Sequence, residues 1–384
     1  MLFEFATATR IIFGNGTIKQ VPAIAMDMGN KILVVTGSNA DRAQVLLDQF
    51  PNPCVSVQTF QVHGEPDVQT VTEGLARARS CGCNLVIGIG GGSALDTAKA
   101  ISALLTNGGD ILDYLEVIGK GQHLINNPIP FIAIPTTAGT GTEVTRNAVI
   151  ASPEHRVKVS LRHPRMLPTL AVIDPELTYS MSPEVTASTG LDALTQVLEP
   201  FVSRKANPVT DAICREGLNR AACSLRTVFD NSQDVDAREN MALVSLFGGL
   251  ALANAGLGAV HGFAGPIGGM FPAPHGAVCA RLLPFVMEAN IKHIKHNNYM
   301  NSLKRFEELS QILTGDHTST INDGVNWIND LCNHLHVPPL SVYGISQSDV
   351  PDIVEKAKFA SSMKGNPVVL PELTLIKILE LAIA

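Results

Sequence analysis

In the first half of this 384-residue chain, short apolar segments that predict buried β-strands alternate with segments whose apolar residues are spaced as in a helix. Runs rich in Val, Ile and Leu occupy residues 31–36, 84–89, 129–134 and 170–174, and glycine follows the first two. Between those two, residues 68–82 space their apolar side chains as a helix does and end at a glycine. Strands that alternate with helices form parallel sheets with crossover connections. The sequence therefore predicts an open α/β structure whose sheet is covered on both faces.

The pattern changes to helices alone in the second half. Residues 183–228, 236–255 and 303–335 place apolar side chains three and four apart with few β-branched runs. Ser182 can cap a helix that Pro183 opens. A chain of this length commonly forms two domains. We therefore expect an α/β domain over residues 1–180 and an all-helical domain over residues 181–384.

The composition narrows the classes of function. With 45% apolar and 16% charged residues, the chain should be compact and globular. A net charge of −7 without a cationic cluster argues against binding to nucleic acid or anionic membranes. No run approaches the roughly 20 apolar residues of a membrane span, and the N-terminal segment does not resemble a secretory signal. Because the seven cysteines are mostly scattered as well, we expect a cytoplasmic protein that acts on small molecules.

A run of three glycines lies between a predicted strand and a predicted helix. Gly90, Gly91 and Gly92 are followed by Ser93, and Asp96 falls in the first turns of the helix. Glycine backbone and an open helix N-terminus together can bind phosphate, although a tight turn alone would explain the same residues. No acidic residue follows a strand roughly 20 residues later, so the usual Rossmann fingerprint is incomplete.

A second polar loop follows the strand at residues 129–134. It places Thr136, Thr137 and Thr140 among glycines at the carboxyl end of that strand. In an open α/β sheet, ligands bind at this edge. Two glycine-rich loops on one edge are harder to explain as turns than one, so the pair favours a binding site.

Carboxylate and imidazole groups suggest a metal site in the second half. Asp192 and Gln196 stand four apart on a predicted helix, and His261 and His275 lie among glycines and small apolar residues. Imidazole combined with carboxylate suits iron or zinc. The histidine spacing matches no compact metal motif, however, and either histidine could be a satisfied core residue. The chemistry of the residues leaves both interpretations open.

Four segments together resemble the iron-containing (group III) alcohol dehydrogenases. They are GGGSALDTAKA at 90–100, PTTAGTGTEVT at 135–145, GLDALTQVLE at 190–199 and AVHGFAGPIGGMFPAPHG at 259–276. The resemblance implies a dehydroquinate synthase-like fold, with a Rossmann-like parallel sheet in an N-terminal dinucleotide-binding domain and an all-α C-terminal domain. It also implies a metal and NAD(P) in the cleft between the domains, and a homodimer.

The resemblance assigns Asp192, His261 and His275 as catalytic metal ligands. The fourth ligand position, normally histidine, is occupied by Gln196, whose neutral oxygen is a weaker ligand for iron or zinc. A second departure is Gly265, where alcohol-reducing members often carry a histidine that relays the proton. The proton would then pass through water, a ribose hydroxyl or another side chain.

The loops and the resemblance together define the expected cofactor site. Where NAD-preferring members often carry an aspartate, this chain has Gly37, which favours NADP with some use of NAD. The expected cofactor-binding residues are Gly37, Ser38, Asn39, Gly90, Gly91, Gly92, Ser93, Asp96, Thr136, Thr137, Thr140, Asn147, Lys158 and Leu177.

The expected activity is reversible hydride transfer between a nicotinamide and a small alcohol or aldehyde, with Fe²⁺ or Zn²⁺ as Lewis acid. Two alternatives stay open at this point. Gln196 also suits a maleylacetate-type reductase of keto or unsaturated acids that has little need of a metal. From another class of protein, a non-catalytic NADP-binding protein could retain the fold with Gln196 and Gly265 in place of reactive groups.

Overall fold

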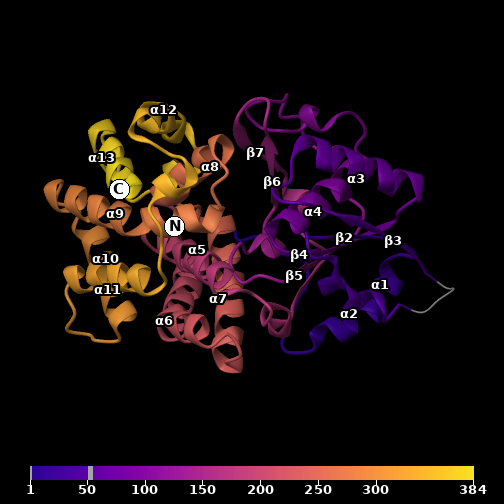
Figure 1. The fold of residues 1–384 in the computed structure, drawn as a ribbon, viewed down its shortest axis with the longest axis horizontal. Coiled ribbons are helices and arrows are strands. Elements are labelled where there is room, and N and C mark those ends of the chain that lie inside the picture. The colour runs from indigo at the N-terminus through magenta and orange to yellow at the C-terminus, as the bar shows by residue number, and fades with distance from the viewer. Residues whose placement is uncertain (1, 51–54) are drawn as a thin grey trace. The chain divides into compact units, whose positions relative to one another are not determined.

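The computed structural model describes residues 2–50 and 55–384. It divides into two compact units (Figure 1). One unit contains residues 7–180, and the other contains residues 181–384 together with the N-terminal residues up to Ala6. Each unit is described by itself below.

A six-stranded parallel sheet forms the centre of the first unit. The strand order is β1-β8-β5-β4-β2-β3, and each predicted strand is present within one or two residues of its expected bounds. The prediction of an N-terminal parallel α/β structure is therefore confirmed. The strands of the sheet are β1 (Ile11–Phe13), β2 (Lys31–Thr36), β3 (Ser56–Gln61), β4 (Leu85–Gly90), β5 (Phe131–Pro135) and β8 (Leu170–Ile173).

Alternate side chains of the central strands pack against helices on opposite faces. On β2, Ile32 and Val34 join the cluster beneath α1 (Val21–Met28) and α2 (Gln44–Leu47). Leu33 and Val35 join the opposite cluster, beneath α3 (Val68–Ser80) and α4 (Gly92–Thr106). Because both faces are covered, the central strands are almost continuously apolar, as expected for a parallel sheet.

The sequence patterns missed several strands of this unit. The antiparallel pair β6 (Asn147–Ser152) and β7 (Val157–Arg162) forms a separate two-stranded sheet. Its residues alternate between buried and exposed, so no continuous apolar run marks it. The edge strands β1 and β3 were also missed because β1 has three residues and β3 is largely half-exposed.

Helices alone make up the second unit. Residues 181–384, all of which the structure describes, contain no β-strand, which confirms the prediction of an all-helical second half. The predicted helical segment 183–228 is two helices, because the chain turns at residues 203–207. The helices are α5 (Pro183–Val202), α6 (Pro208–Asp230), α7 (Val235–Ala255), α8 (Ala259–Met270), α9 (His275–His296), α10 (Met300–Thr314), α11 (Ile321–His334), α12 (Val350–Phe359) and α13 (Glu372–Ile383).

Helix α5 is the central helix of this unit. The Ser182 hydroxyl accepts a hydrogen bond from the Val185 N–H at 3.3 Å and Pro183 occupies the first turn, as the sequence predicts. Every residue from Gly190 to Val202 is buried, and the helix packs against α6, α7 and α9. Polar residues on such a helix need partners or a function, because burying an unpaired polar group is costly.

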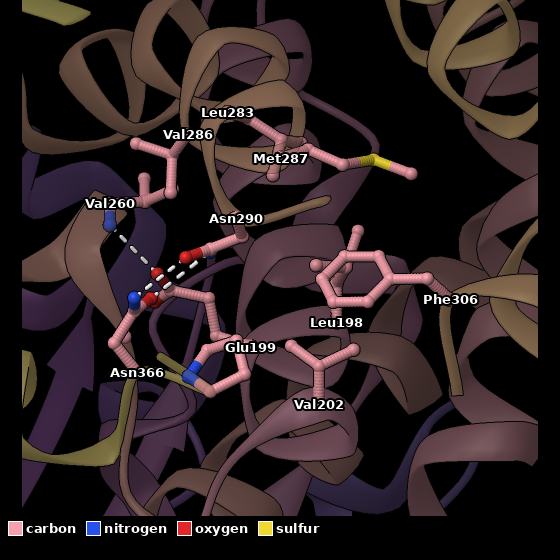
Figure 2. Close-up of a pocket in the computed structure, with 12 residues that line it drawn as sticks. Leu198, Glu199, Val202, Val260, Leu283, Val286, Met287, Asn290, Phe306 and Asn366 are labelled. Carbon is pink, nitrogen blue, oxygen red and sulfur yellow. Dashed lines mark hydrogen bonds between the residues drawn. The ribbon is translucent and has the colours of Figure 1, made fainter. Parts of the chain in front are cut away.

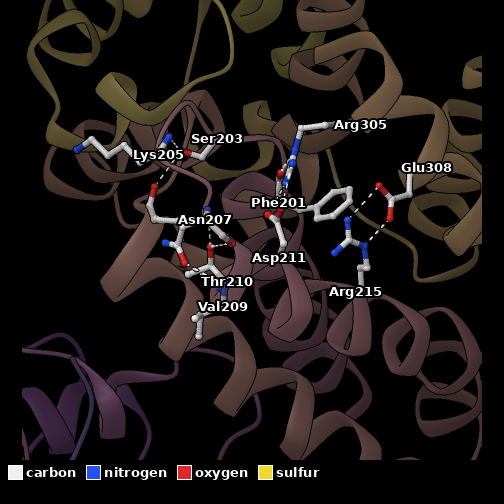
Figure 3. A network of polar contacts seen from close by, with 11 residues as sticks. Phe201, Ser203, Lys205, Asn207, Val209, Thr210, Asp211, Arg215, Arg305 and Glu308 are labelled. Carbon is white, nitrogen blue, oxygen red and sulfur yellow. Dashed lines mark hydrogen bonds and ion pairs between the residues drawn. The ribbon is translucent and has the colours of Figure 1, made fainter. Parts of the chain in front are cut away.

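Two arginines hold the C-terminal end of α5 (Figure 3). The Arg305 guanidinium donates to the Phe201 carbonyl at 2.6 Å and pairs with Asp211 at the start of α6. The Arg215 guanidinium pairs with Glu308 of α10. Both guanidinium carbons also lie over the Phe201 ring, 4.6 and 5.4 Å from its centroid. These contacts fix the helix that carries Asp192 relative to α6 and α10.

Within the described residues, no single helix has the length and hydrophobicity needed to cross a membrane. Helices α7 and α8 meet that criterion only when taken together, with a bend of 99° between them.

Candidate active site

Three side chains expected to bind a metal come together in the helical unit. Asp192 lies in the middle of α5, His261 in the first turn of α8, and His275 at the first position of α9. The Nε2 atom of His261 is 3.2 Å from Oδ1 of Asp192, and the Nε2 atom of His275 is 3.9 Å from the same oxygen. Together with Sγ of Cys279, these donor atoms all lie within 4.8 Å of one another.

The donor set fits a divalent transition metal. With bonds of about 2.0–2.3 Å, neighbouring ligands of a tetrahedral ion lie about 3.3–3.8 Å apart. The separations of 3.2 and 3.9 Å between the two imidazole nitrogens and Oδ1 of Asp192 are close to this range. Imidazole nitrogen, carboxylate oxygen and sulfur are donors for zinc and iron rather than for magnesium or calcium. These residues could therefore hold the metal that the resemblance implies.

The candidate metal site formed by Asp192, His261, His275 and Cys279, called the cluster below, is buried on one side and open on the other. The side chains of Asp192 and His261 are 3% and 5% exposed, whereas that of His275 is 36% exposed. A ligand can therefore approach the donor atoms from the side of His275.

Glycine sets the distance between the two helices that carry Asp192 and His275. A Cβ atom at Gly276 would lie 2.3 Å from the Ser188 carbonyl oxygen and 3.4 Å from Asp192 Cβ. Only glycine allows α9 to approach α5 this closely, because a side chain there would overlap with backbone.

Glu199 orients His261, a role that the sequence patterns did not reveal. Its Oε2 atom lies 2.7 Å from Nδ1 of His261, and its Oε1 atom accepts the Val260 N–H at 2.7 Å. A carboxylate on Nδ1 leaves Nε2 free to face a metal and raises the basicity of the ring. The spacing carried a signal, since Glu199 lies two turns after Asp192 on the same face of α5.

Two asparagine side chains, Asn290 and Asn366, line the same small pocket as Glu199 (Figure 2). Asn366 accepts the Ala259 N–H at 3.1 Å and exchanges two hydrogen bonds with Asn290, at 3.1 and 2.7 Å. Glu199 and Asn366 therefore cap α8, whose N-cap residue has no side chain to do so. A cavity of about 10 Å³ beside them has room for about one water molecule.

The electrostatics of the cluster favour an ionised Asp192. Burial alone would raise the pKa of this carboxyl group, but its hydrogen bond with His261 and the nearby imidazoles bring the pKa below its usual value. Burial opposes the charged form of His261 as well, yet Cys279, Asp192 and Glu199 raise its pKa well above the usual value. A metal ion at this place competes with these protons.

The two departures from the family pattern are both placed near the cluster. The Gln196 side chain is buried and forms a hydrogen bond with Asp192, while its Oε1 atom has no hydrogen-bond partner among the described residues. Gly265 lies one helical turn after His261, and apart from the adjacent residues and backbone of its own helix, no atom of the described chain lies within 4 Å of the position a Cβ would take. A larger side chain would therefore fit at Gly265.

In the α/β unit, the three glycines lie at the expected turn between strand and helix. Gly90 ends β4, Gly91 precedes α4, and α4 begins at Gly92. No side chain caps this helix, so N–H groups of its first turn are left for other acceptors. Such a helix start, reached through glycine backbone, can bind a phosphate.

The threonine loop lies against this glycine turn. The Thr136 N–H donates to the Gly90 carbonyl at 2.8 Å. A Cβ at Gly91 would lie 3.5 Å from Thr137, and a Cβ at Gly92 would lie 3.0 Å from Thr140. The structure thus brings together the two loops that the sequence placed at one edge of the sheet.

The loop after β2 lies beside the same glycine turn. Strands β2 and β4 are neighbours, and a Cβ at Gly90 would lie 3.2 Å from the Gly37 nitrogen. The space around Gly37 is open, and Ser38 and Asn39 are exposed. Because the chain runs outward to β3 and returns to β4, this is the point where the strand order reverses and where ligands bind in such sheets.

Four expected cofactor residues are held by other parts of the same unit. Asp96 is buried and accepts hydrogen bonds from the Thr142 hydroxyl and the Val149 N–H. Lys158 forms an ion pair with Glu65 at 3.2 Å, and the Asn147 carbonyl accepts a hydrogen bond from the Lys99 ammonium. Leu177 packs against the apolar cluster beneath α1 and α2. These contacts support the loops of the expected cofactor site.

Buried charges anchor the threonine loop to α4. The Lys99 ammonium donates to the Thr142 carbonyl at 2.8 Å and to the Thr145 hydroxyl at 3.0 Å. Burial lowers the pKa of Lys99 to about 8, and burial raises the pKa of Glu143 to about 7. The backbone of the threonine loop is therefore held in part by Lys99, a buried group whose charged form is destabilised by burial.

Comparison with known proteins identifies the family. Residues 8–175 match the family described as iron-containing alcohol dehydrogenase, and residues 186–383 match its C-terminal family. The chain belongs to the iron-containing alcohol dehydrogenases, which confirms the resemblance. It is an oxidoreductase that acts on CH–OH groups, and its family implies a metal and NAD(H) as cofactors.

Three similar proteins act on different small substrates. The chain is 35% identical over 370 residues to choline dehydrogenase of Bacillus subtilis (strain 168), covering 94% of this chain and 90% of the relative. A solved 1,3-propanediol oxidoreductase superposes with a TM-score of 0.92 at 30% identity, covering 100% of both chains. Sulfoacetaldehyde reductase from Bifidobacterium kashiwanohense in complex with NAD⁺ gives 0.87 at 28% identity, covering 100% of this chain and 99% of the other.

Proposed function

We propose that this protein is a metal-dependent, NADP-preferring alcohol dehydrogenase that interconverts a small alcohol and its aldehyde. The observation that supports this most strongly is the set of donor atoms of Asp192, His261 and His275, with His261 oriented by Glu199. A reductase without need of a metal would not require such a set. The proposed metal is Fe²⁺ or Zn²⁺.

The helical unit positions the oxygen of the substrate. Asp192, His261 and His275 hold the metal, which when bound supplies a Lewis acid for the alcohol or carbonyl oxygen. Glu199 keeps Nε2 of His261 directed at the other donors throughout the reaction. The exposed side of His275 gives the substrate its path to the cluster.

The α/β unit binds the cofactor. The N–H groups at the uncapped start of α4 and in the glycine turn would donate hydrogen bonds to the pyrophosphate. Thr136, Thr137 and Thr140 would supply hydroxyl groups beside it. When bound, the nicotinamide would supply or accept the hydride at its C4 atom, in exchange with the carbon that bears the substrate oxygen. Since Gly265 cannot carry a proton, we propose that the alcohol proton leaves through water or a ribose hydroxyl.

The preference for NADP rests on the loop after β2. An acid at the end of this strand would accept a hydrogen bond from the ribose 2′-hydroxyl and repel a 2′-phosphate. Gly37 lacks such a group, and the space around it is open. Arg42 follows in the 3-10 turn Ala40–Ala43 and is the nearest cation along the chain.

Elemental analysis of the purified protein, together with an NADPH oxidation screen over aldehydes and keto acids, tests the proposal. Stoichiometric metal and aldehyde turnover support it. Turnover of keto or unsaturated acids by metal-free protein would instead indicate a maleylacetate-type reductase. Tight NADPH binding with no turnover of any substrate would indicate a non-catalytic binding protein. The homodimer and the cytoplasmic location stay predictions that need measurements of mass in solution and of localisation.

A further inference from the structure

We propose that Cys279 is the fourth protein ligand of the metal, taking the role that the family gives to the position of Gln196. The proposal rests on the proposed function, because it assumes that Asp192, His261 and His275 hold a metal. It goes further by assigning a sulfur ligand and, through it, the class of metal.

The position of Cys279 on α9 suits this role. It follows His275 by four residues, so both side chains leave the same face of the first turns of the helix. Its Sγ atom lies 3.7 Å from Nε2 of His275, a separation expected for two ligands of one tetrahedral ion. Sγ is also within 4.8 Å of the Asp192 and His261 donor atoms.

Gln196 is engaged differently. Its side chain hydrogen bonds to Asp192, and its Oε1 atom lies 3.2 Å from the position of a Cβ at Gly248, against the backbone of α7. The amide therefore steadies the carboxylate ligand, while the sulfur completes the donor set. A thiolate is also a stronger ligand for zinc than a neutral amide oxygen.

The other buried cysteines of the described chain have no such surroundings. Cys332 on α11 places Sγ 3.6 Å from the Ala280 carbonyl, next to Cys279 in sequence, yet it belongs to no cluster of donor groups among the described residues. Its thiol is thus a matched control, buried beside the same helix but outside the site.

Coordination of the metal by Cys279 involves the loss of one proton and no transfer of electrons. The thiol releases its proton to solvent, and a sulfur lone pair forms the bond to the metal without any change of oxidation state. One thiolate, two imidazoles and one carboxylate suit zinc and iron rather than ions that prefer oxygen, and a closed tetrahedral set of four protein ligands that includes sulfur is typical of zinc. We therefore assign zinc as the metal class of this chain.

X-ray absorption of the zinc-loaded full-length protein is the decisive experiment, with metal content measured on the same sample. The expected spectrum of the wild type contains one sulfur scatterer at about 2.3 Å beside nitrogen and oxygen neighbours. The cobalt-substituted protein should show a sulfur-to-cobalt charge-transfer absorption in the near ultraviolet. Both signals should persist in Cys332→Ser and vanish in Cys279→Ser, whose zinc affinity should fall at least about tenfold.

The outcomes separate this proposal from the proposed function. Stoichiometric zinc with only nitrogen and oxygen neighbours overturns the sulfur ligand and leaves the metal-dependent dehydrogenase intact; loss of zinc in Gln196→Ala would then identify the amide as ligand. Absence of bound metal in the wild type overturns both proposals. The wild-type spectrum decides the question even if Cys279→Ser does not fold.

Discussion

The regions of this protein that we expect to bind the cofactor and the metal are built in different ways. In the α/β unit, the expected cofactor site consists mainly of backbone at the ends of β2, β4 and β5, and each loop follows directly from a strand. In the helical unit, the site consists of side chains from α5, α8 and α9 that are distant in sequence. A backbone site tolerates many substitutions as long as its small residues remain, whereas a side-chain site fails when one donor is lost. Single substitutions should expose this difference.

The largest effect is expected for His261→Ala, which removes a donor atom from the side-chain site. Without the imidazole, which also leaves Oε2 of Glu199 without its histidine partner, the metal should be lost and turnover should fall at least about 100-fold, the scale expected for a lost Lewis acid. Metal content and kcat/KM measure this. His293→Ala, on α9 and hydrogen-bonded to Thr374, is the control and should keep both values. Full activity of the metal-free variant would remove the basis of the proposed mechanism.

The next effect concerns the buried charges that support the backbone site. Burial raises the pKa of Glu143 to about 7 from its model-peptide value of 4.5, so the folded protein binds more protons than the unfolded chain between these values. Glu143 therefore stabilises least above pH 7, and its contribution is lost as the pH rises from about 4.5 to 7. At about 1.4 kcal/mol per pKa unit, the change is on the order of 3 kcal/mol.

Glu143→Gln removes this titration. The free energy of unfolding of Glu143→Gln should rise relative to the wild type as the pH increases from 4.5 to 7, in denaturant titrations at several pH values. The exposed Glu154→Gln provides the comparison and should follow the wild type. A constant difference between Glu143→Gln and the wild type across this range would show that Glu143 titrates as an ordinary carboxyl group.

A smaller effect is expected for Glu199→Gln, which tests orientation within the side-chain site. The amide oxygen can still accept the Val260 N–H, but the amide nitrogen cannot accept a hydrogen bond from His261. Metal affinity should fall about 10–100-fold, as is usual for partners of ligating histidines. Competition with a chelator measures the affinity, and the exposed Glu184→Gln should behave as wild type. Unchanged metal affinity would show that Glu199 caps α8 but does not orient His261 for metal binding.

The smallest effect is expected for Gly37→Asp in the backbone site. The open space around Gly37 admits the carboxylate without repacking, so folding should be unaffected. The ratio of kcat/KM values for NADP and NAD should shift toward NAD by about tenfold, through repulsion of the 2′-phosphate. Gly108→Asp adds the same charge in open space beyond the other end of α4 and should leave the ratio unchanged. An unaltered ratio in Gly37→Asp would remove the reason for preferring NADP.

Much of the fold follows from local patterns in the sequence. The apolar runs of β2, β4, β5 and β8 identify buried strands because both faces of the sheet are covered. Ser182 and Pro183 mark the start of α5 through capping chemistry that involves only neighbouring residues. The hairpin of β6 and β7 was missed because its residues are only partly buried, and pairing between strands is not visible in either strand alone.

The two candidate sites differ in the same way, since one can be identified from contiguous residues and the other depends on contacts between helices. The glycine and threonine loops are contiguous, so their residues could be identified before their contact was known. Glu199 and Cys279 are different, since their roles depend on which helices lie together. Spacing from Asp192 and His275 placed each on a suitable helix face, but only the packing of α5 with α8 and α9 distinguishes them from other buried residues.

The close approach at Gly276 has a consequence for how this enzyme can lose activity. The distance between Asp192 on α5 and His275 on α9 depends on the absence of a side chain at Gly276, because a Cβ there would overlap with the Ser188 carbonyl oxygen. Alanine at this position would push His275 and Cys279 away from Asp192 by a fraction of the length of a coordination bond. We expect such a variant to keep the fold of both units and to lose affinity for the proposed metal.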